Sequence, residues 1–208
     1  MNISKHIDFL FKDTLGELFF LGRKTRLLII YVLYTVWSYI ILTLKRVSLG
    51  KSCRFNGFPY MYRYPGSKIK IGCNCLFTSN RYSNLIGVNR KCIISTHSEE
   101  AIIEIGNNCG LSGVSIGATK LITLGNNVRC GANVVITDFD WHDEDPRTND
   151  ARPVIIEDDV WLGMDVIVLK GVTIGRNTII GAGSVVTRDI KPNMIAAGNP
   201  CKEIKPVE

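Results

Sequence analysis

A six-residue repeat of apolar residues constrains the fold of this chain more than any other feature. Between residues 156 and 186 every sixth residue is apolar: Ile156, Leu162, Val168, Ile174, Ile180 and Val186. An α-helix does not explain this spacing, because 3.6 residues per turn carries residues six apart to different faces. A short internal repeat instead predicts a solenoid, whose units bury their apolar faces by stacking on one another.

The repeat also extends upstream of residue 156. Pairs of an apolar residue followed by glycine mark earlier units, at Ile71-Gly72, Ile86-Gly87, Ile105-Gly106, Ile116-Gly117 and Leu124-Gly125. Short β-branched runs suit flat parallel strands, and Gly and Asn suit corners that need positive φ. We therefore predict an all-β solenoid of parallel strands from about residue 67 to residue 202, preceded by an N-terminal α-helical segment.

The repeat is expected to break strongly only once, at residues 137–153. This stretch, TDFDWHDEDPRTNDARP, is polar and rich in turn formers. Insertions in solenoids become loops on one face, which is often the functional face. His142 lies in this loop among the acidic residues Asp138, Asp140, Asp143, Glu144 and Asp145. A carboxylate bonded to one ring nitrogen would hold the tautomer and raise the basicity of the other nitrogen, so His142 is a candidate for acid–base chemistry.

The first 49 residues are expected to form a separate helical segment. Residues 7–21, IDFLFKDTLGELFFL, are amphipathic and predict a first helix that Gly22 ends. Residues 27–44, LLIIYVLYTVWSYIILTL, carry no charge and are flanked by Arg23, Lys24, Arg26, Lys45 and Arg46. Their length is at the lower limit for a membrane-spanning helix, and the Tyr and Trp residues in their middle prefer an interface to the bilayer centre.

Three arrangements of residues 27–44 are open at this stage. The helix lies in the cytoplasmic leaflet with its basic flanks on lipid phosphates, or it packs against the solenoid or a neighbouring subunit, or it spans the membrane. A cleaved signal peptide is not expected, because the apolar run starts late and no small-residue cleavage site follows it. We therefore divide the chain into a helical segment, residues 1–49, and a solenoid domain, residues 50–208. In the first of the three arrangements the helical segment is associated with the membrane.

The charge of the chain allows an acidic partner. Its 25 Lys and Arg against 19 Asp and Glu give a net charge of +6. Nucleic acid is not the expected partner, because the basic residues are scattered and no binding motif is present. The seven cysteines are an odd, dispersed set without a C-x-x-C pair, which argues against a disulfide framework. We expect reduced thiols in the core of a cytosolic protein.

Three stretches carry a resemblance to a known family: TDFDWHDEDPR, PVIIEDDVWLGMDVIVLKGVTIGRNTIIGAGSVVTRDI and AAGNPCKEIK. In this order they resemble the hexapeptide-repeat acyltransferases, of the maltose, galactoside, nodulation-type and O-antigen or capsule O-acetyltransferase kind. The resemblance covers roughly residues 50–205. It implies a left-handed parallel β-helix, and the handedness comes from the family alone because parallel crossovers are otherwise right-handed.

The resemblance also implies a reaction and a set of site residues. Members are trimers that hold acyl-CoA in a groove between adjacent β-helices. His142 would be the general base, oriented by Asp138 or Asp140, with no metal and no covalent intermediate. A backbone N–H near residues 161–164 would stabilise the oxyanion. Acetyl-CoA would contact Trp161, Gly163, Met164, Ala182, Thr187, Arg188, Lys202 and Lys205, and the sugar acceptor would contact Ser112, Asn133 and Trp161.

Two departures from the family pattern bear on the acceptor. Asp143 follows His142 where the sugar acetyltransferases have proline, which leaves the acceptor open, and Cys201 replaces the usual alanine after G-N-P. The apolar run at residues 27–44 differs from the soluble helical cap of the maltose and galactoside enzymes. It favours the surface-polysaccharide branch, with a cytoplasmic enzyme at the inner face of the plasma membrane.

Three other functions compete with sugar O-acetylation. The first is N-acylation of an amino sugar or amino acid within the same fold. The second is a carbonic anhydrase-type hydratase, which needs three histidines on zinc, whereas the solenoid contains only His97 and His142. The third is a non-catalytic scaffold, which predicts that replacing His142 changes nothing.

Overall fold

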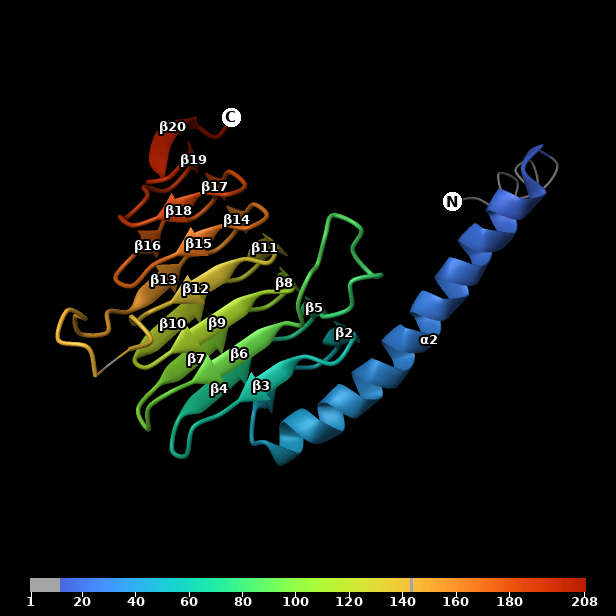
Figure 1. Ribbon diagram of the computed structural model, residues 1–208, viewed down its shortest axis with the longest axis horizontal. Coiled ribbons are helices and arrows are strands. Elements are labelled where there is room, and N and C mark those ends of the chain that lie inside the picture. The colour runs from blue at the N-terminus through green and yellow to red at the C-terminus, as the bar shows by residue number, and fades with distance from the viewer. Residues whose placement is uncertain (1–11, 143) are drawn as a thin grey trace.

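The computed structural model describes residues 12–142 and 144–208, which form a three-sided β-solenoid preceded by one long helix (Figure 1). Strands on the three sides form three sheets. Sheet A contains β1 (Ser48–Leu49), β4 (Lys68–Ile71), β7 (Ile102–Ile105), β10 (Leu121–Leu124), β13 (Val154–Ile156) and β16 (Thr173–Ile174). Sheet B contains β2 (Arg54–Asn56), β5 (Leu76–Thr78), β8 (Gly110–Ser112), β11 (Arg129–Ala132), β14 (Trp161–Leu162), β17 (Ile179–Ile180), β19 (Met194–Ala197) and β20 (Lys202–Pro206).

Sheet C completes the solenoid with β3 (Tyr60–Tyr62), β6 (Ile93–Thr96), β9 (Ser115–Ala118), β12 (Val135–Thr137), β15 (Ile167–Val168) and β18 (Val185–Val186). Neighbouring strands are parallel, except that β20 runs antiparallel to β19. Ile156 pairs with Ile174, Leu162 with Ile180 and Val168 with Val186. Three six-residue units therefore make one coil, and the repeating apolar residues form the buried core.

Asparagine and aspartate turn the chain from sheet A to sheet B. The same corner position of successive coils holds a residue with φ between 55° and 61°: Asn74, Asn108, Asn127, Asp159, Asn177 and Asn193. Asn and Asp tolerate this left-handed conformation better than other residues with side chains. The predicted use of Asn at the corners is confirmed.

A second long loop, which the sequence pattern did not predict, leaves the solenoid at residues 79–92, between β5 and β6. The expectation of a single large insertion was therefore wrong. The Ile86-Gly87 pair lies inside this loop with Ile86 exposed, so it does not open a repeat unit. The cause of the error is that one apolar-glycine pair carries little positional information without neighbours at six-residue spacing.

The helix α2 (Thr14–Leu44) starts at Asp13, whose side chain accepts a hydrogen bond from the Gly16 amide at 2.9 Å. It continues through Gly22, so the predicted helix end there was wrong; residues 7–11 of the predicted first helix lie outside the described residues. A single glycine costs a helix only about 1 kcal/mol, and the strong helix formers around it carry the helix onward. Its C-terminal third packs on the first coil, where Leu42 is fully buried.

Candidate functional site

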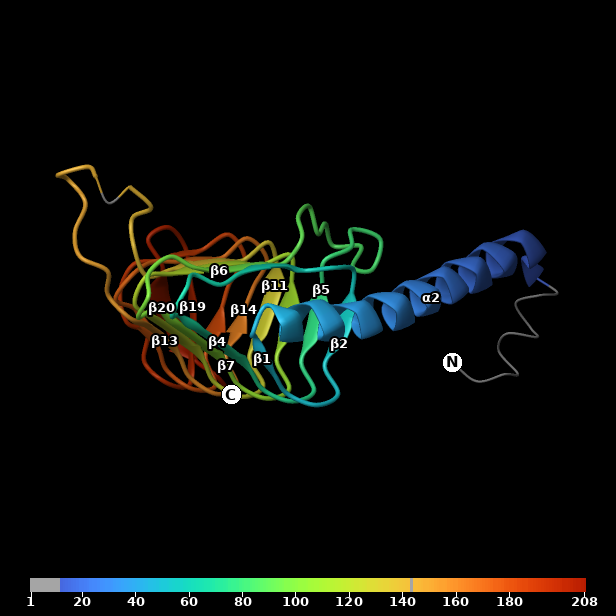
Figure 2. The ribbon, with the colours of Figure 1, turned by 90° about the horizontal axis from the view of Figure 1, so that it is seen from below.

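The loop of residues 137–153 leaves the solenoid at the corner where sheet C passes to sheet A, between β12 and β13 (Figure 2). Its first residues are fixed by an aromatic cluster on the outer surface of sheet C. The ring centroids of Phe139 and Trp141 are 4.6 Å apart. The ring centroid of His97 lies 5.2 Å from that of Phe139 and 4.9 Å from that of Trp141. The Trp141 ring covers Gly117, where a Cβ atom would lie 2.5 Å from the ring.

His97 therefore has a structural position that was not predicted. Its Nε2 lies 2.8 Å from the Ser95 hydroxyl, and its ring supports the loop residue next to His142. The sequence contained one usable signal. His97 directly follows β6, and Phe139 lies just after β12 at the same edge of sheet C. Recognising that the two residues are aligned, however, requires knowledge of the strand register between coils.

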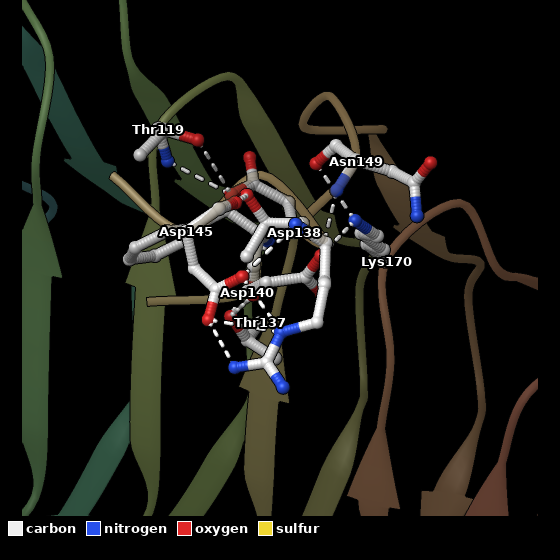
Figure 3. Close-up of polar contacts among 10 residues, drawn as sticks. Thr119, Thr137, Asp138, Asp140, Asp145, Asn149 and Lys170 are labelled. Carbon is white, nitrogen blue, oxygen red and sulfur yellow. Dashed lines mark hydrogen bonds and ion pairs between the residues drawn. The ribbon is translucent and has the colours of Figure 1, made fainter. Parts of the chain in front are cut away.

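Asp138 is fully buried and holds the preceding coil rather than His142. Its carboxylate accepts hydrogen bonds from the amides of Thr119 (2.8 Å), Lys120 (2.8 Å) and Leu121 (2.7 Å), as Figure 3 shows in part. A carboxylate with three backbone donors has little capacity left for an imidazole. The geometry thus gives Asp138 a positioning role at the base of the loop instead of the predicted contact with His142.

Asp140 is also engaged elsewhere. Its Oδ2 accepts hydrogen bonds from Lys170 Nζ at 2.5 Å and from the Asn149 amide at 3.1 Å (Figure 3). The hydrogen bond from Lys170 is the main reason that the pKa of Asp140 is lowered. Lys170 also donates to the Asn149 carbonyl at 2.8 Å, so this lysine joins the two arms of the loop. Neither predicted aspartate contacts His142 among the described residues.

His142 lies beyond this fixed base, with 75% of its side chain exposed. The nearest carboxylate among the described residues is Glu144, whose Oε1 is 3.6 Å from His142 Nδ1. That separation is longer than a hydrogen bond. The imidazole is therefore presented to solvent on a loop whose two ends are fixed.

The predicted cofactor residues divide into separate groups. Trp161 is exposed on sheet B, and Gly163, Met164 and Ala182 follow it at the corner between sheets B and C. This corner is made of small residues in adjacent coils, and the amides of Trp161 and Gly163 bond to the next coil. Those two amides are therefore not free to stabilise an oxyanion, so neither of them is the donor expected near residues 161–164.

The other predicted cofactor residues lie elsewhere on the protomer. Thr187 and Arg188 follow β18 at the corner between sheets C and A, the same corner from which the histidine loop leaves. Lys202 and Lys205 lie on β20 at the C-terminal end of the solenoid and are exposed. One protomer thus does not bring all of the predicted cofactor residues together.

Sheet B carries a polar groove of about 610 Å³ that contains two of the predicted acceptor residues, Ser112 and Trp161. Arg129 pairs with Trp161 across adjacent strands, and Arg54 and Asn84 also line the groove. These three residues were missed. The sequence did contain a signal for Arg129: it directly precedes the core residue Cys130, just as Trp161 directly precedes the core residue Leu162.

Asn133, the third predicted acceptor residue, is buried and serves the loop of residues 79–92. Its side chain donates to the Gly87 carbonyl at 2.9 Å and accepts from the Asn89 amide at 3.1 Å. It does not face the groove. Asn84 of the same loop is within 3.4 Å of the Ser112 hydroxyl, so Asn133 acts on the groove only by supporting this loop.

The two halves of the candidate site lie on opposite parts of one protomer. In a three-sided solenoid, the corner between sheets C and A is opposite the face formed by sheet B. His142 leaves from that corner and Trp161 lies on that face, and Figure 2 shows the loop projecting away from the solenoid on the side opposite α2. Within the described part of the chain, no group of His, Cys, Asp and Glu has the arrangement of a metal site.

The fold and these residues define a parallel β-helix built from hexapeptide repeats. The pattern of the family described as "Bacterial transferase hexapeptide (six repeats)" matches residues 153–188. The galactoside O-acetyltransferase of Lactococcus lactis is 51% identical over 137 residues, which is 64% of this chain and 60% of that protein. The galactoside O-acetyltransferase of Escherichia coli is 42% identical over 90 residues, which is 41% of this chain and 44% of that protein.

The chain is thus similar to the hexapeptide-repeat acetyltransferases, and its three-sided parallel solenoid fits the left-handed β-helix that this resemblance implies. It spans about half the length of the curated relatives it matches. A solved N-acyltransferase of Bacillus cereus, in complex with dTDP and coenzyme A, shares the fold at 21% identity with a TM-score of 0.51, over 80% of this chain and 88% of that one.

Proposed function

We propose that this chain is an O-acetyltransferase that moves acetyl from acetyl-CoA to a sugar hydroxyl of a surface-polysaccharide precursor. The observation that carries the proposal is the exposed imidazole of His142 on a loop fixed at both ends by Trp141 and Lys170. Two relatives that are 42% and 51% identical over the matched residues are named galactoside O-acetyltransferases. Their names support acetyl transfer to a hydroxyl more directly than to an amine.

His142 acts as the general base in this proposal. A neutral ring nitrogen takes the proton of the acceptor hydroxyl while the hydroxyl oxygen attacks the thioester carbonyl carbon. A C–O bond forms, and the tetrahedral intermediate then collapses with cleavage of the C–S bond. The imidazolium returns its proton to the leaving sulfur, which gives the acetyl ester and the free thiol of CoA. No covalent acyl-enzyme is formed, so no cysteine takes part.

The site is completed by a second copy of the chain. Because His142 and Trp161 lie on opposite parts of one protomer, a neighbouring copy must bring its sheet B face to the loop for the two residues to meet. A homotrimer with three such contacts is a closed arrangement that repeats one heterologous interface. The sugar then lies between His142 of one copy and the groove of Ser112, Arg129 and Trp161 of the next.

Acetyl-CoA follows the corner between sheets B and C. In this proposal the pantetheine arm lies along Gly163, Met164 and Ala182 at this corner, and Trp161 covers the thioester. Arg188, which follows Thr187 in the chain, and Lys202 and Lys205 on β20 supply cations for the phosphates from separate parts of the site. Since acetyl-CoA is made inside the cell, we place the reaction on the cytoplasmic side.

The test is acetyl transfer to a panel of sugars. The purified chain is incubated with acetyl-CoA and with acceptors that carry hydroxyls only or an added amine, and thiol release is measured together with product mass. Ester products from hydroxyl acceptors support the proposal. Reaction of amine acceptors alone would identify an N-acyltransferase instead, and the absence of both CoA binding and transfer would identify a scaffold.

Replacement of His142 tests the assignment of the base. His142→Ala should lower acetyl transfer at least about 100-fold, because general acid–base catalysis contributes roughly 10²–10⁴-fold. CoA affinity, measured by calorimetry, should be unchanged. Arg147→Ala is the matched control, because Arg147 is exposed on the same loop and pairs only with Asp145 among the described residues. Equal activity of the two variants would contradict the assignment.

A further inference from the structure

The outward side of helix α2 is apolar, whereas its side toward the solenoid carries polar groups as well as the buried Leu42. Its inner side hydrogen-bonds the first coil: the Tyr39 hydroxyl donates to the Gly50 carbonyl at 2.9 Å, and the Thr35 hydroxyl accepts from the Phe55 amide at 3.1 Å. Ser38 on the same side is fully buried. Apart from Thr43, the exposed residues between positions 28 and 44 are large and mostly apolar: Leu28, Ile29, Val32, Leu33, Tyr34, Val36, Trp37, Ile40 and Leu44.

A water-soluble surface helix would instead carry polar and charged residues on its outward side. Thr35 and Ser38 interrupt the apolar run in the sequence, but in the structure they face protein. The surface left outside is therefore more apolar than the sequence of the run suggests. By its length and composition α2 is able to cross a membrane, and a contiguous apolar surface of this size marks an interaction site.

A second segment carries exposed apolar side chains on the same side of the molecule. The loop of residues 79–92 projects toward α2 (Figure 1), with Leu85, Ile86 and Tyr82 exposed at its tip. It contacts the helix through Arg23, whose guanidinium donates to the Tyr82 carbonyl at 3.0 Å, and through Arg26, which lies over the Tyr82 ring. Two segments distant in sequence thus form one apolar surface.

We propose that this surface, α2 together with the tip of the 79–92 loop, is inserted in a lipid bilayer that contains anionic lipids. Lipid can cover every side of the helix that the solenoid leaves exposed, whereas a protein partner covers one side. Leu28 and Trp37 are about 180° apart on the helix, and they are 60% and 56% exposed. A second copy seated on one of them would leave the other in water.

The charges near the helix agree with this partner. Arg23, Lys24 and Arg26 lie before the uncharged run, and Lys45 and Arg46 follow it. Basic residues at both ends of an apolar segment pair with lipid phosphates at the headgroup level. The histidine loop leaves on the opposite side of the same protomer (Figure 2), so insertion of α2 leaves that loop in water.

Vesicle flotation of the full-length chain tests the proposal. The chain should float with vesicles of phosphatidylcholine and phosphatidylglycerol. It should stay bound at about 1 M NaCl, where the screening length falls to about 3 Å and surface attraction is lost. Leu33→Glu places a charge in the inserted surface and should lower the bound fraction about tenfold or more. Ile204→Glu is the matched control, because Ile204 on β20 is 65% exposed and Leu33 is 64% exposed.

Each other outcome overturns the proposal. Failure to float, complete release by salt, or equal effects of the two substitutions would exclude insertion. Loss of the oligomer in Leu33→Glu with flotation unchanged would show that α2 packs against a second copy. Thermal melts test whether both variants are folded. If Leu33→Glu does not fold, Leu33→Gln takes its place in the experiment. The result is independent of the acetyltransferase proposal, because Leu33 lies outside the proposed site and transfer to a water-soluble sugar should be unchanged in Leu33→Glu.

Discussion

At the scale of single residues, a missing side chain allows the histidine loop to start where it does. Gly117 on β9 gives the Trp141 ring a flat place on sheet C, and the ring also packs against His97 and Phe139. Trp141 itself has φ of 67°, a conformation that side chains adopt rarely and that tertiary contacts must hold. His142 follows directly, so its position depends on this stack.

Gly117→Ala should therefore displace the loop without unfolding the solenoid. The new methyl group would lie 2.5 Å from the Trp141 ring, and the ring must move outward. A shift of about 1 Å at a catalytic group can cost up to roughly 100-fold in rate, and we expect a loss of about tenfold in kcat with unchanged CoA affinity. Hydrogen exchange at residues 139–142 should be faster than in the native protein.

The control for this substitution is Gly22→Ala. That methyl group meets nothing within 4 Å, so exchange in the loop and kcat should match the native protein. If Gly117→Ala also matches, the stack does not position His142. Saturation of the rate with acetyl-CoA in both variants separates the effect on kcat from an effect on binding.

Single-residue roles were the least predictable part of the site. Asp138 was assigned to His142 from its closeness in sequence, but its carboxylate binds the amides of residues 119–121 in the previous coil. That contact depends on which residues of two coils are stacked, and composition or spacing within one loop does not contain this information. His142 itself was identifiable because its loop breaks a periodic pattern.

At the scale of elements, an ion pair holds together the two arms of the histidine loop. Lys170, which follows β15, binds Asp140 near the start of the loop and the Asn149 carbonyl near its end. The pKa of Asp140 is lowered, mainly by this hydrogen bond. A lowered pKa means that the folded loop favours the ionised carboxylate.

The pH dependence of the loop follows from the sign of that shift. The contribution of Asp140 to loop stability is complete above the ordinary Asp pKa of about 3.9 and is lost as the pH falls through the lower value of the folded state. Native hydrogen exchange should show the Asn149 amide protected at neutral pH and less protected in this acid range. Lys170→Met should remove the protection at neutral pH as well.

Lys191→Met is the control for a lost surface lysine, because Lys191 pairs with Glu203 far from the loop. Equal exchange of the Asn149 amide in the Lys170→Met and Lys191→Met variants would show that the ion pair does not hold the loop.

Among the elements, the repeat strands and the histidine loop were predicted from the sequence, and the 79–92 loop was not. The strands that flank the 79–92 loop, β5 and β6, do not carry a regular six-residue pattern, so no gap in the pattern reveals the insertion.

At the scale of the whole molecule, the solenoid was predictable because each coil contacts only its neighbours. A pattern six residues long is then sufficient to place Ile156, Leu162 and Val168 on three successive sides. The proposed arrangement of copies does not follow from the repeat, since the proposed contact between His142 of one copy and the sheet B face of another involves no repeat. Only the placement of the two residues on opposite parts of one protomer indicates it.

Complementation between two inactive variants tests the shared site. His142→Ala and Trp161→Ala should each abolish most acetyl transfer in homogeneous oligomers. In a mixed trimer, a site works when a protomer with intact His142 faces a protomer with intact Trp161. Random assembly from equal amounts makes about one site in four of this kind, so co-expression should restore about a quarter of the native activity. Mixing the two purified trimers without exchange of subunits should restore none. If both residues serve the same protomer, no combination of the variants contains a complete site, and co-expression would leave the activity as low as in either variant alone.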